Sequence, residues 1–217
     1  MTRRGQQAFP FDPPTPDFSE DALIVTDAIR AAVKAALAPA PFKAAVALIA
    51  PEGAGKRHIA SIWAARFGGA VVDLAAGDAP AEGRVAAVGA DRRAEPADLL
   101  RLLKRAEAGT PVLLCGRPEI TDWSAGLPDI ATRLKSVRRV DLPPPDDALV
   151  RALLRKRLAD RGLIVSEGVL AFAAARAPRA YDGLQEVVER ADRLAMEEGA
   201  GRTCSLDIMR RAIETCA

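Results

Sequence analysis

An apolar strand, a glycine-containing loop and the start of a helix follow one another between Ala44 and His58. The loop reads Ala50-Pro-Glu-Gly-Ala-Gly-Lys56, and large apolar residues recur at helical spacing after it, at Ile59, Ile62, Trp63 and Phe67. In a P-loop, a glycine-rich turn points backbone N–H groups and a lysine at phosphates, and a Ser or Thr after the lysine binds Mg²⁺. The segment therefore predicts a phosphate-binding loop inside an α/β fold.

Two positions of this loop depart from the phosphate-binding pattern. Ala50 stands where the opening glycine is expected, and Arg57 stands where the hydroxyl ligand of Mg²⁺ is expected. A guanidinium beside a divalent cation is unfavourable by Coulomb's law, so we expect no Mg-ATP bound in the usual manner, and Arg57 either meets a phosphate directly or points outward. Gly53, Gly55, Lys56 and Arg57 are thus the candidate residues of a degenerate cofactor site, which binds ADP or ATP weakly without Mg²⁺ or binds no cofactor.

The pattern of predicted elements changes near Leu142. Before it, apolar strands alternate with helices, which indicates a parallel α/β sheet; we expect the strands at 44–50, 70–74, 85–88, 111–115 and 137–142, and helices near 27–37, 56–67 and 97–107. After Pro143-Pro-Pro145 the pattern is purely helical, with helix N-caps expected at Asp146 or Asp147, Ser166 and Ser205. We therefore divide the chain into an extended tail at 1–18, an α/β base at 19–144 and an α-helical lid at 145–217.

The composition narrows the classes of function. Lys+Arg 31 against Asp+Glu 29 leaves a net charge of +2, which is too small for a nonspecific DNA-binding surface. Cys115, Cys204 and Cys216 form no CxxC pair, as expected of reduced thiols in a cytoplasmic protein, and one histidine argues against a His-rich metal site. No apolar run approaches the roughly 20 residues that cross a bilayer. We expect a cytoplasmic protein without a metal site or a membrane partner.

The tail carries one notable segment, Gln6-Gln-Ala-Phe-Pro-Phe11. Phe9 and Phe11, separated by Pro10 and preceded by Gln6, make an extended peptide with two apolar anchors and one polar side chain. Such a peptide either binds a partner or fastens the tail to the domain.

Three segments in a fixed order carry a resemblance to a known family. They are Ala50 to His58, Gly126-Leu-Pro-Asp-Ile-Ala-Thr-Arg-Leu134, and Leu142-Pro-Pro-Pro-Asp-Asp-Ala-Leu149. Together they look like the DnaA-related Hda family, which regulates the bacterial replication initiator DnaA, and the resemblance covers essentially the whole chain. It implies a P-loop AAA+ base with a five-stranded parallel sheet, a small α-helical lid, and no DNA-binding domain of the initiator's kind, so that DNA is contacted only indirectly.

The resemblance also implies partners. Hda proteins bind the DNA polymerase sliding clamp through an N-terminal hexapeptide, and Gln6 to Phe11 is similar to it. Arg133 matches the family's arginine finger, the residue presented to a neighbour's ATP; otherwise it is a solvated surface arginine. The implied function is negative regulation of replication initiation by an adaptor that binds the clamp and DnaA. Association into homo-oligomers is compatible with an AAA+ fold.

The groups that hydrolyse ATP are replaced in this chain. Gly89 and Ala90 stand where the acidic pair that orients Mg²⁺ and water is expected, and Asp91 either substitutes for it or caps the following segment. Cys115, a weak hydrogen-bonding group, stands at the polar sensor position.

The lid arginine that would contact the nucleotide aligns with Asp182, or with Arg179 after a shift of three. These losses indicate a pseudo-ATPase rather than a slow enzyme, and the resemblance implies that it acts on a partner's ATP. The alternatives are a nucleotide-binding AAA+ ATPase or switch, in which Lys56 holds phosphate and Asp91 holds the metal, and a clamp-loader-like structural subunit.

Overall fold

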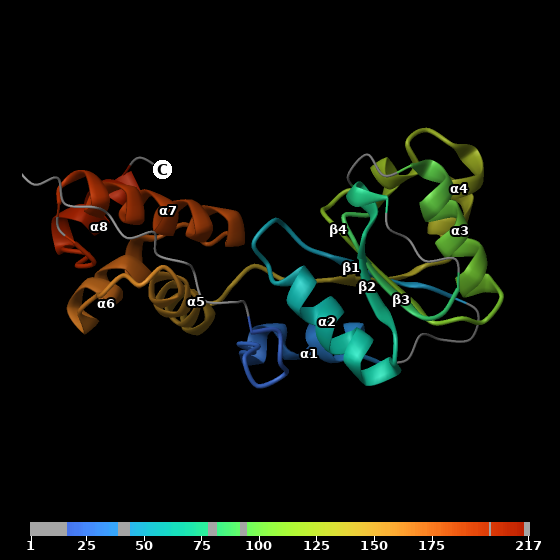
Figure 1. Ribbon diagram of the computed structural model, residues 1–217, viewed down its shortest axis with the longest axis horizontal. Coiled ribbons are helices and arrows are strands. Elements are labelled where there is room, and N and C mark those ends of the chain that lie inside the picture. Colours follow the sequence, from blue (N-terminus) through green and yellow to red (C-terminus); the bar gives the residue numbers. More distant parts are fainter. Residues whose placement is uncertain (1–16, 39–43, 78–81, 92–94, 200, 215–217) are drawn as a thin grey trace, which may run out of the picture.

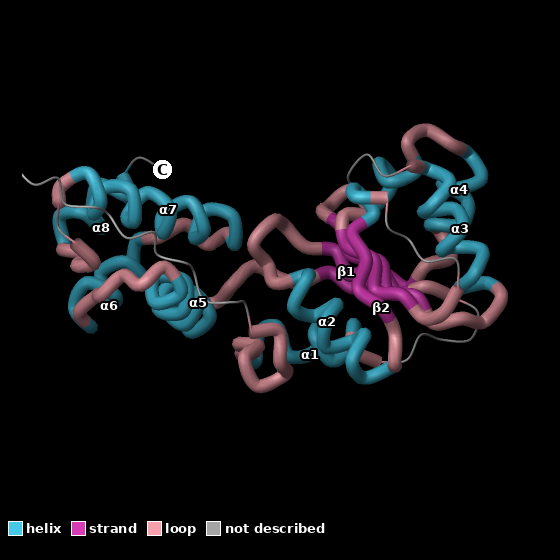
Figure 2. Tube along the Cα trace, viewed as in Figure 1, coloured by secondary structure: helices cyan, strands magenta, loops and turns pink. Residues whose placement is uncertain are grey.

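The computed structural model describes residues 17–38, 44–77, 82–91, 95–199 and 201–214. The segment from Gln6 to Phe11, with Phe9 and Pro10, lies outside these residues. The described chain forms a sheet with flanking helices and then a cluster of helices, as Figures 1 and 2 show. The elements are α1 (Asp27–Ala36), β1 (Val46–Ile49), α2 (Lys56–Phe67), β2 (Ala70–Asp73), β3 (Val85–Val88), α3 (Pro96–Glu107), β4 (Val112–Gly116), α4 (Pro128–Leu134), β5 (Arg138–Asp141), α5 (Asp147–Asp160), α6 (Glu167–Arg176), α7 (Tyr181–Glu197) and α8 (Leu206–Glu214), with 3₁₀ turns η1 (Leu74–Ala76) and η2 (Ile120–Ser124).

The five strands form one parallel sheet in the order β2-β3-β4-β1-β5. β1 is paired with β4 on one side and with β5 on the other, so that Leu48 lies between Cys115 and Val140. All residues of β1, β3 and β4 are buried, as expected of parallel strands covered on both faces. The predicted α/β class and five-stranded parallel sheet are confirmed.

Alternate residues of the central strands β1, β3 and β4 enter two separate hydrophobic cores, because successive strand side chains point to opposite faces. Val46 and Leu48 pack with α1 and α2, whereas Ala47 and Ile49 pack with α3 and α4. Figure 1 shows the two pairs of helices on opposite sides of the sheet. We call the sheet with α1 to α4 the base.

The helices α5 to α8, here called the lid, enclose a core of their own that includes Leu154, Leu184 and Met209. Three predicted N-caps are confirmed: Asp146 accepts a hydrogen bond from the Leu149 amide at 2.8 Å, and Ser166 and Ser205 make the corresponding bonds at the starts of α6 and α8. The switch to helices after the prolines is thus seen in the structure. We retain 19–144 and 145–217 as proposed domain limits.

The residue that precedes α1 is bonded to the start of the lid. Thr26 stands at the N-cap of α1, but its side chain makes no capping hydrogen bond. Its hydroxyl instead donates to the Asp146 carboxylate at 3.2 Å, at the start of the lid. The segment that leads into α1 therefore contacts both parts of the chain.

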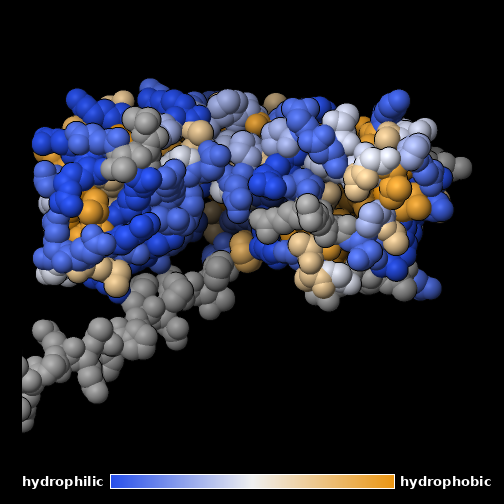
Figure 3. Space-filling model, turned by 90° about the horizontal axis from the view of Figure 1, so that it is seen from above, coloured by the Kyte–Doolittle hydropathy of each residue, from blue (hydrophilic) through white to orange (hydrophobic). Residues whose placement is uncertain are grey.

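The surface is mostly hydrophilic on the face drawn in Figure 3, with hydrophobic colour confined to small patches. Among the described residues, no helix combines the length and apolar character that a membrane span requires.

Candidate nucleotide site

The loop between β1 and α2 has the backbone of a phosphate-binding turn. Gly53 and Gly55 adopt left-handed φ angles of 75° and 81°, and α2 begins directly after Gly55, at Lys56. Glycine is suited to this conformation because it has no Cβ. The free N–H groups and the dipole at a helix start favour anions. The loop has therefore kept the shape that the sequence predicted.

The lysine of this loop is bound to the loop itself. Lys56 Nζ donates to the carbonyl oxygens of Ala50 at 2.7 Å and Pro51 at 2.6 Å. Burial lowers the pKa of Lys56, because the charged ammonium loses hydration. Two of the three ammonium donors are therefore engaged by the loop before any phosphate arrives.

Arg57 points away from the phosphate position. Its Nη2 forms an ion pair with Asp73 Oδ2 at 2.7 Å, at the end of β2. Of the two alternatives left open by the sequence, the structure shows the outward one, with a carboxylate partner that the sequence did not suggest.

The end of β3 carries no carboxylate at the expected positions. β3 ends at Val88, and Gly89, with φ 74°, and the buried Ala90 follow it. The next residue, Asp91, has a side chain that is only 8% exposed and pairs with Arg117 Nε at 2.6 Å. The carboxylate therefore faces the cation that follows β4, whereas the segment that Asp91 was expected to cap, 92–94, lies outside the described residues.

Cys115 is buried inside β4, on the face of the sheet that packs against α2. Burial raises the pKa of its thiol to about 12, so the group is neutral at physiological pH. A protonated thiol is a weak hydrogen-bond donor, and this one is closed off from solvent. Cys115 therefore does not supply a polar contact to a bound phosphate.

The lid contributes different residues from those predicted. Arg179 lies just before α7 and pairs with Asp147 at 2.9 Å. Asp182, in the first turn of α7, lines a cleft beside the loop. The lid arginine that reaches the loop is Arg157 of α5, whose Nη2 donates to the Gly53 carbonyl oxygen at 2.6 Å. The sequence did not single out Arg157, because it is one of several arginines on the same helix.

The cleft between the loop and the lid has a volume of about 640 Å³ and is strongly acidic. Seven carboxylates and one guanidinium line it: Glu52, Asp91, Glu119, Asp122, Asp182, Glu186, Glu189 and Arg117. Some carboxylates are ion-paired, such as Glu189 with Arg161, but the lining remains predominantly negative. A triphosphate entering from this side meets like charge. None of the described His, Cys, Asp and Glu side chains form a group of three or more arranged to hold a metal ion.

The arginine-finger candidate is engaged within the chain. Arg133 of α4 forms ion pairs with Glu107, at the end of α3, and with Asp129 at 2.9 Å. Hydrogen bonding to Glu107 is the main cause that raises the pKa of Arg133 above its ordinary value. These contacts use Nε and Nη1 and hold the guanidinium between α4 and the end of α3.

Comparisons with known proteins identify the fold. No family model matches the sequence, and no curated protein matches it. Among solved structures, domain III of the replication initiation protein DnaA from Thermotoga maritima is similar with a TM-score of 0.65 and 16% identity, over 94% of this chain and 98% of that one. A RuvB mutant from the same organism matches with a TM-score of 0.60 and 14% identity, over 92% and 72% of the two chains.

A third structure extends the comparison. The replication initiator DnaA bound to AMPPCP and single-stranded DNA matches with a TM-score of 0.59 and 10% identity, over 87% of this chain and 70% of that one. The chain therefore has the fold of the AAA+ domains of DnaA and RuvB. At these identities the likeness concerns the fold alone.

The residues at this site do not fit Mg-ATP, the cofactor that an AAA+ fold implies. Carboxylates that would orient the metal are replaced by Gly89 and Ala90, and the hydroxyl ligand is replaced by Arg57, which is paired with Asp73. The cleft that adjoins the loop is acidic. We therefore assign no hydrolytic step to this chain.

Proposed function

We propose that the chain is a replication-related AAA+ adaptor of the Hda kind, which binds the sliding clamp and acts on the initiator DnaA without hydrolysing ATP itself. In this proposal Gln6, Phe9, Pro10 and Phe11 bind the clamp. The base presents Arg133 to the initiator, whose own ATP is then hydrolysed. In this proposal the protein acts in the cytoplasm.

One observation carries the proposal. A DnaA-like AAA+ fold spans 94% of the chain, while the groups that a hydrolytic site needs are replaced or engaged elsewhere. Natural selection for ATP hydrolysis would act on those groups first, since metal and water positioning account for most of the catalysis in phosphoryl transfer. A DnaA-like fold without them is suited to act on another molecule.

The partner segment supports the same conclusion from the sequence. An extended peptide with aromatic anchors and a polar side chain is a common recognition element, because a few buried aromatic residues dominate the binding energy. Gln6 to Phe11 has this composition.

The test combines clamp binding with initiator ATP hydrolysis. We expect the full chain to bind a purified bacterial sliding clamp and to accelerate ATP hydrolysis by DnaA on clamp-loaded DNA. Replacing Phe9 and Phe11 by Ala abolishes clamp binding, whereas replacing the neighbouring Gln7 by Ala leaves it unchanged. A chain that shows no clamp binding contradicts the adaptor proposal.

A second variant separates clamp binding from the acceleration of ATP hydrolysis by DnaA. Arg133→Ala removes the acceleration of DnaA hydrolysis and retains clamp binding, because the tail is untouched. Arg101, on the neighbouring helix α3 and paired with Asp98, is the matched control. An Arg133→Ala protein that accelerates hydrolysis as well as the parent does excludes the arginine-finger role.

A structural scaffold is the second candidate, and the Arg133 contacts favour it. An arginine held by Glu107 and Asp129 joins α4 to α3 and is not extended toward a partner. A clamp-loader-like subunit of this kind binds the clamp without accelerating DnaA hydrolysis, so the same assay distinguishes the two.

A further inference from the structure

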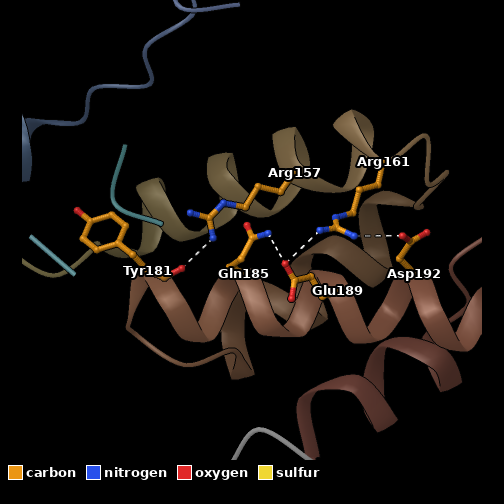
Figure 4. A network of polar contacts seen from close by, with 6 residues as sticks. All are labelled: Arg157, Arg161, Tyr181, Gln185, Glu189 and Asp192. Carbon is orange, nitrogen blue, oxygen red and sulfur yellow. Dashed lines mark hydrogen bonds and ion pairs between the residues drawn. The ribbon is translucent and has the colours of Figure 1, made fainter. Parts of the chain in front are cut away.

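One guanidinium joins the P-loop to the lid. Arg157 of α5 donates from Nη2 to the Gly53 carbonyl at 2.6 Å and from Nη1 to the Tyr181 carbonyl at 2.9 Å. Figure 4 shows the second bond spanning from α5 to the start of α7. The two acceptors belong to the base and to the lid, so a single planar group connects both parts.

The backbones of the loop and the lid are in direct contact at the same place. A Cβ atom added to Gly53 would lie 2.9 Å from the Tyr181 carbonyl oxygen and 3.3 Å from Arg157 Nη2. A separation below 3 Å is a steric overlap, so this approach requires glycine. Gly55 has a similar φ angle but no atom within 4 Å of an added Cβ. The need for glycine at position 53 thus comes partly from the lid.

Lid side chains complete the core of the base. Leu149 of α5 and Tyr181 of α7 are buried within the same cluster as α1 and α2. The Tyr181 hydroxyl donates to the Pro143 carbonyl at 2.9 Å, in the connection between base and lid. These contacts hold the start of α7 against the loop.

The two lid helices that carry the bridge are also cross-linked to each other. Arg161, directly after α5, pairs with Glu189 and Asp192 of α7, each at 3.2 Å, and Gln185 donates to Glu189 at 2.7 Å (Figure 4). Because α5 and α7 are joined in this way, a contact made by Arg157 restrains both helices together.

We propose that Arg157 is a built-in latch that holds the lid closed on the P-loop without nucleotide. The guanidinium makes the connection between loop and lid from within the chain. The lid therefore stays closed on the base without nucleotide. The surface that base and lid form together is always exposed. This inference does not depend on the identity of the partner.

Native-state hydrogen exchange of the full chain tests the latch. In Arg157→Ala, we expect amide exchange at residues 181–185, at the start of α7, to accelerate by about tenfold or more, because hydrogen bonds from a charged donor each contribute at least the ~1.4 kcal/mol that corresponds to tenfold. Exchange in the cores of α6 and α8 stays unchanged. Arg155→Ala is the matched control, since Arg155 lies on the same helix and pairs with Glu167.

A glycine pair keeps the test independent of Arg157. Gly53→Ala and Gly55→Ala impose the same kind of backbone strain, but only the first places a methyl group against the lid. We expect Gly53→Ala to accelerate exchange at 181–185 and Gly55→Ala to leave it unchanged. Equal effects of the two variants overturn the proposal.

The last comparison is hydrogen exchange with and without nucleotide. We expect millimolar Mg-ATP to leave exchange at 181–185 unchanged in the parent chain. Slower exchange with Mg-ATP, unaltered exchange in Arg157→Ala, or a uniform acceleration across the whole chain in that variant each overturns the latch.

Discussion

Raising the pH from 7 to 10 is expected to destabilise the chain through its two buried thiols. Burial raises the pKa of Cys115 from 9.0 to about 12 and that of Cys204 from 9.0 to about 11. A raised pKa means that the folded state holds the proton more tightly than the unfolded state. The contribution to stability is therefore complete below pH 9 and is lost as the pH rises toward the folded pKa.

The size of this loss follows from the difference in proton affinity. At pH 10 an unfolded thiol is about nine-tenths ionised, whereas the buried thiols remain mostly protonated. At one pH unit above the unfolded pKa, each thiol has lowered the free energy of unfolding by about 1.4 kcal/mol. The two thiols together lower it by roughly 3 kcal/mol. A native domain has a stability of only about 5 to 15 kcal/mol, so the change is readily measured.

Urea unfolding followed by far-ultraviolet circular dichroism measures the effect at pH 7 and pH 10, with reductant present and at fixed ionic strength. In Cys115→Ala, we expect the stability difference between the two pH values to shrink by about 1.4 kcal/mol, whatever the variant's stability at pH 7. Cys204→Ala is the matched comparison. If Cys115→Ala retains the full pH dependence of the parent, the thiol is not buried as described and the reasoning is refuted.

Three further outcomes are expected. Gly116→Ala places a methyl group 2.3 Å from Trp123 Cζ2, and overpacking of this kind costs about 1 to 3 kcal/mol in urea unfolding; an unchanged midpoint contradicts the packing. Millimolar Mg-ATP produces no shift in the thermal midpoint of the parent chain or of Lys56→Ala, and a shift in the parent that Lys56→Ala removes would restore the ATP-binding hypothesis. Ser166→Ala lowers stability by about 1 kcal/mol, because it removes the cap to the Val169 amide; Ser61→Ala, whose hydroxyl bonds a carbonyl within α2, is the control.

The acidic cleft and the Arg157 latch both lie where a nucleotide would contact base and lid. A nucleotide in an AAA+ protein commonly contacts both base and lid, and its phosphates require positive charge. Here the space beside the loop is lined by carboxylates, and the connection between base and lid is made by Arg157. The arrangement favours a fixed scaffold over a nucleotide-driven switch.

The fold class and most of its elements could be predicted from the sequence. Continuous apolar runs such as Val46 to Ile49 predicted buried parallel strands, because strands covered on both faces contain few polar residues. Local chemistry placed the caps at Asp146, Ser166 and Ser205, since an N-cap depends on hydrogen bonds within a few residues. The loss of acidic residues at Gly89 and Ala90 was also visible, because it depends only on which residues are present.

The directions of the charged side chains depend on the tertiary structure and could not be predicted from the sequence. The Arg57 partner, Asp73, lies 16 residues away in sequence, and the Arg157 partner, Gly53, lies 104 residues away. A long flexible side chain reaches many acceptors, so its choice depends on how helices and strands pack and on which carboxylates that packing brings near. For the same reason the ion pair between Asp91 and Arg117, which follows β4, left no signal in the sequence. The backbone pattern is encoded locally, whereas the electrostatics of the site arise from contacts between distant segments.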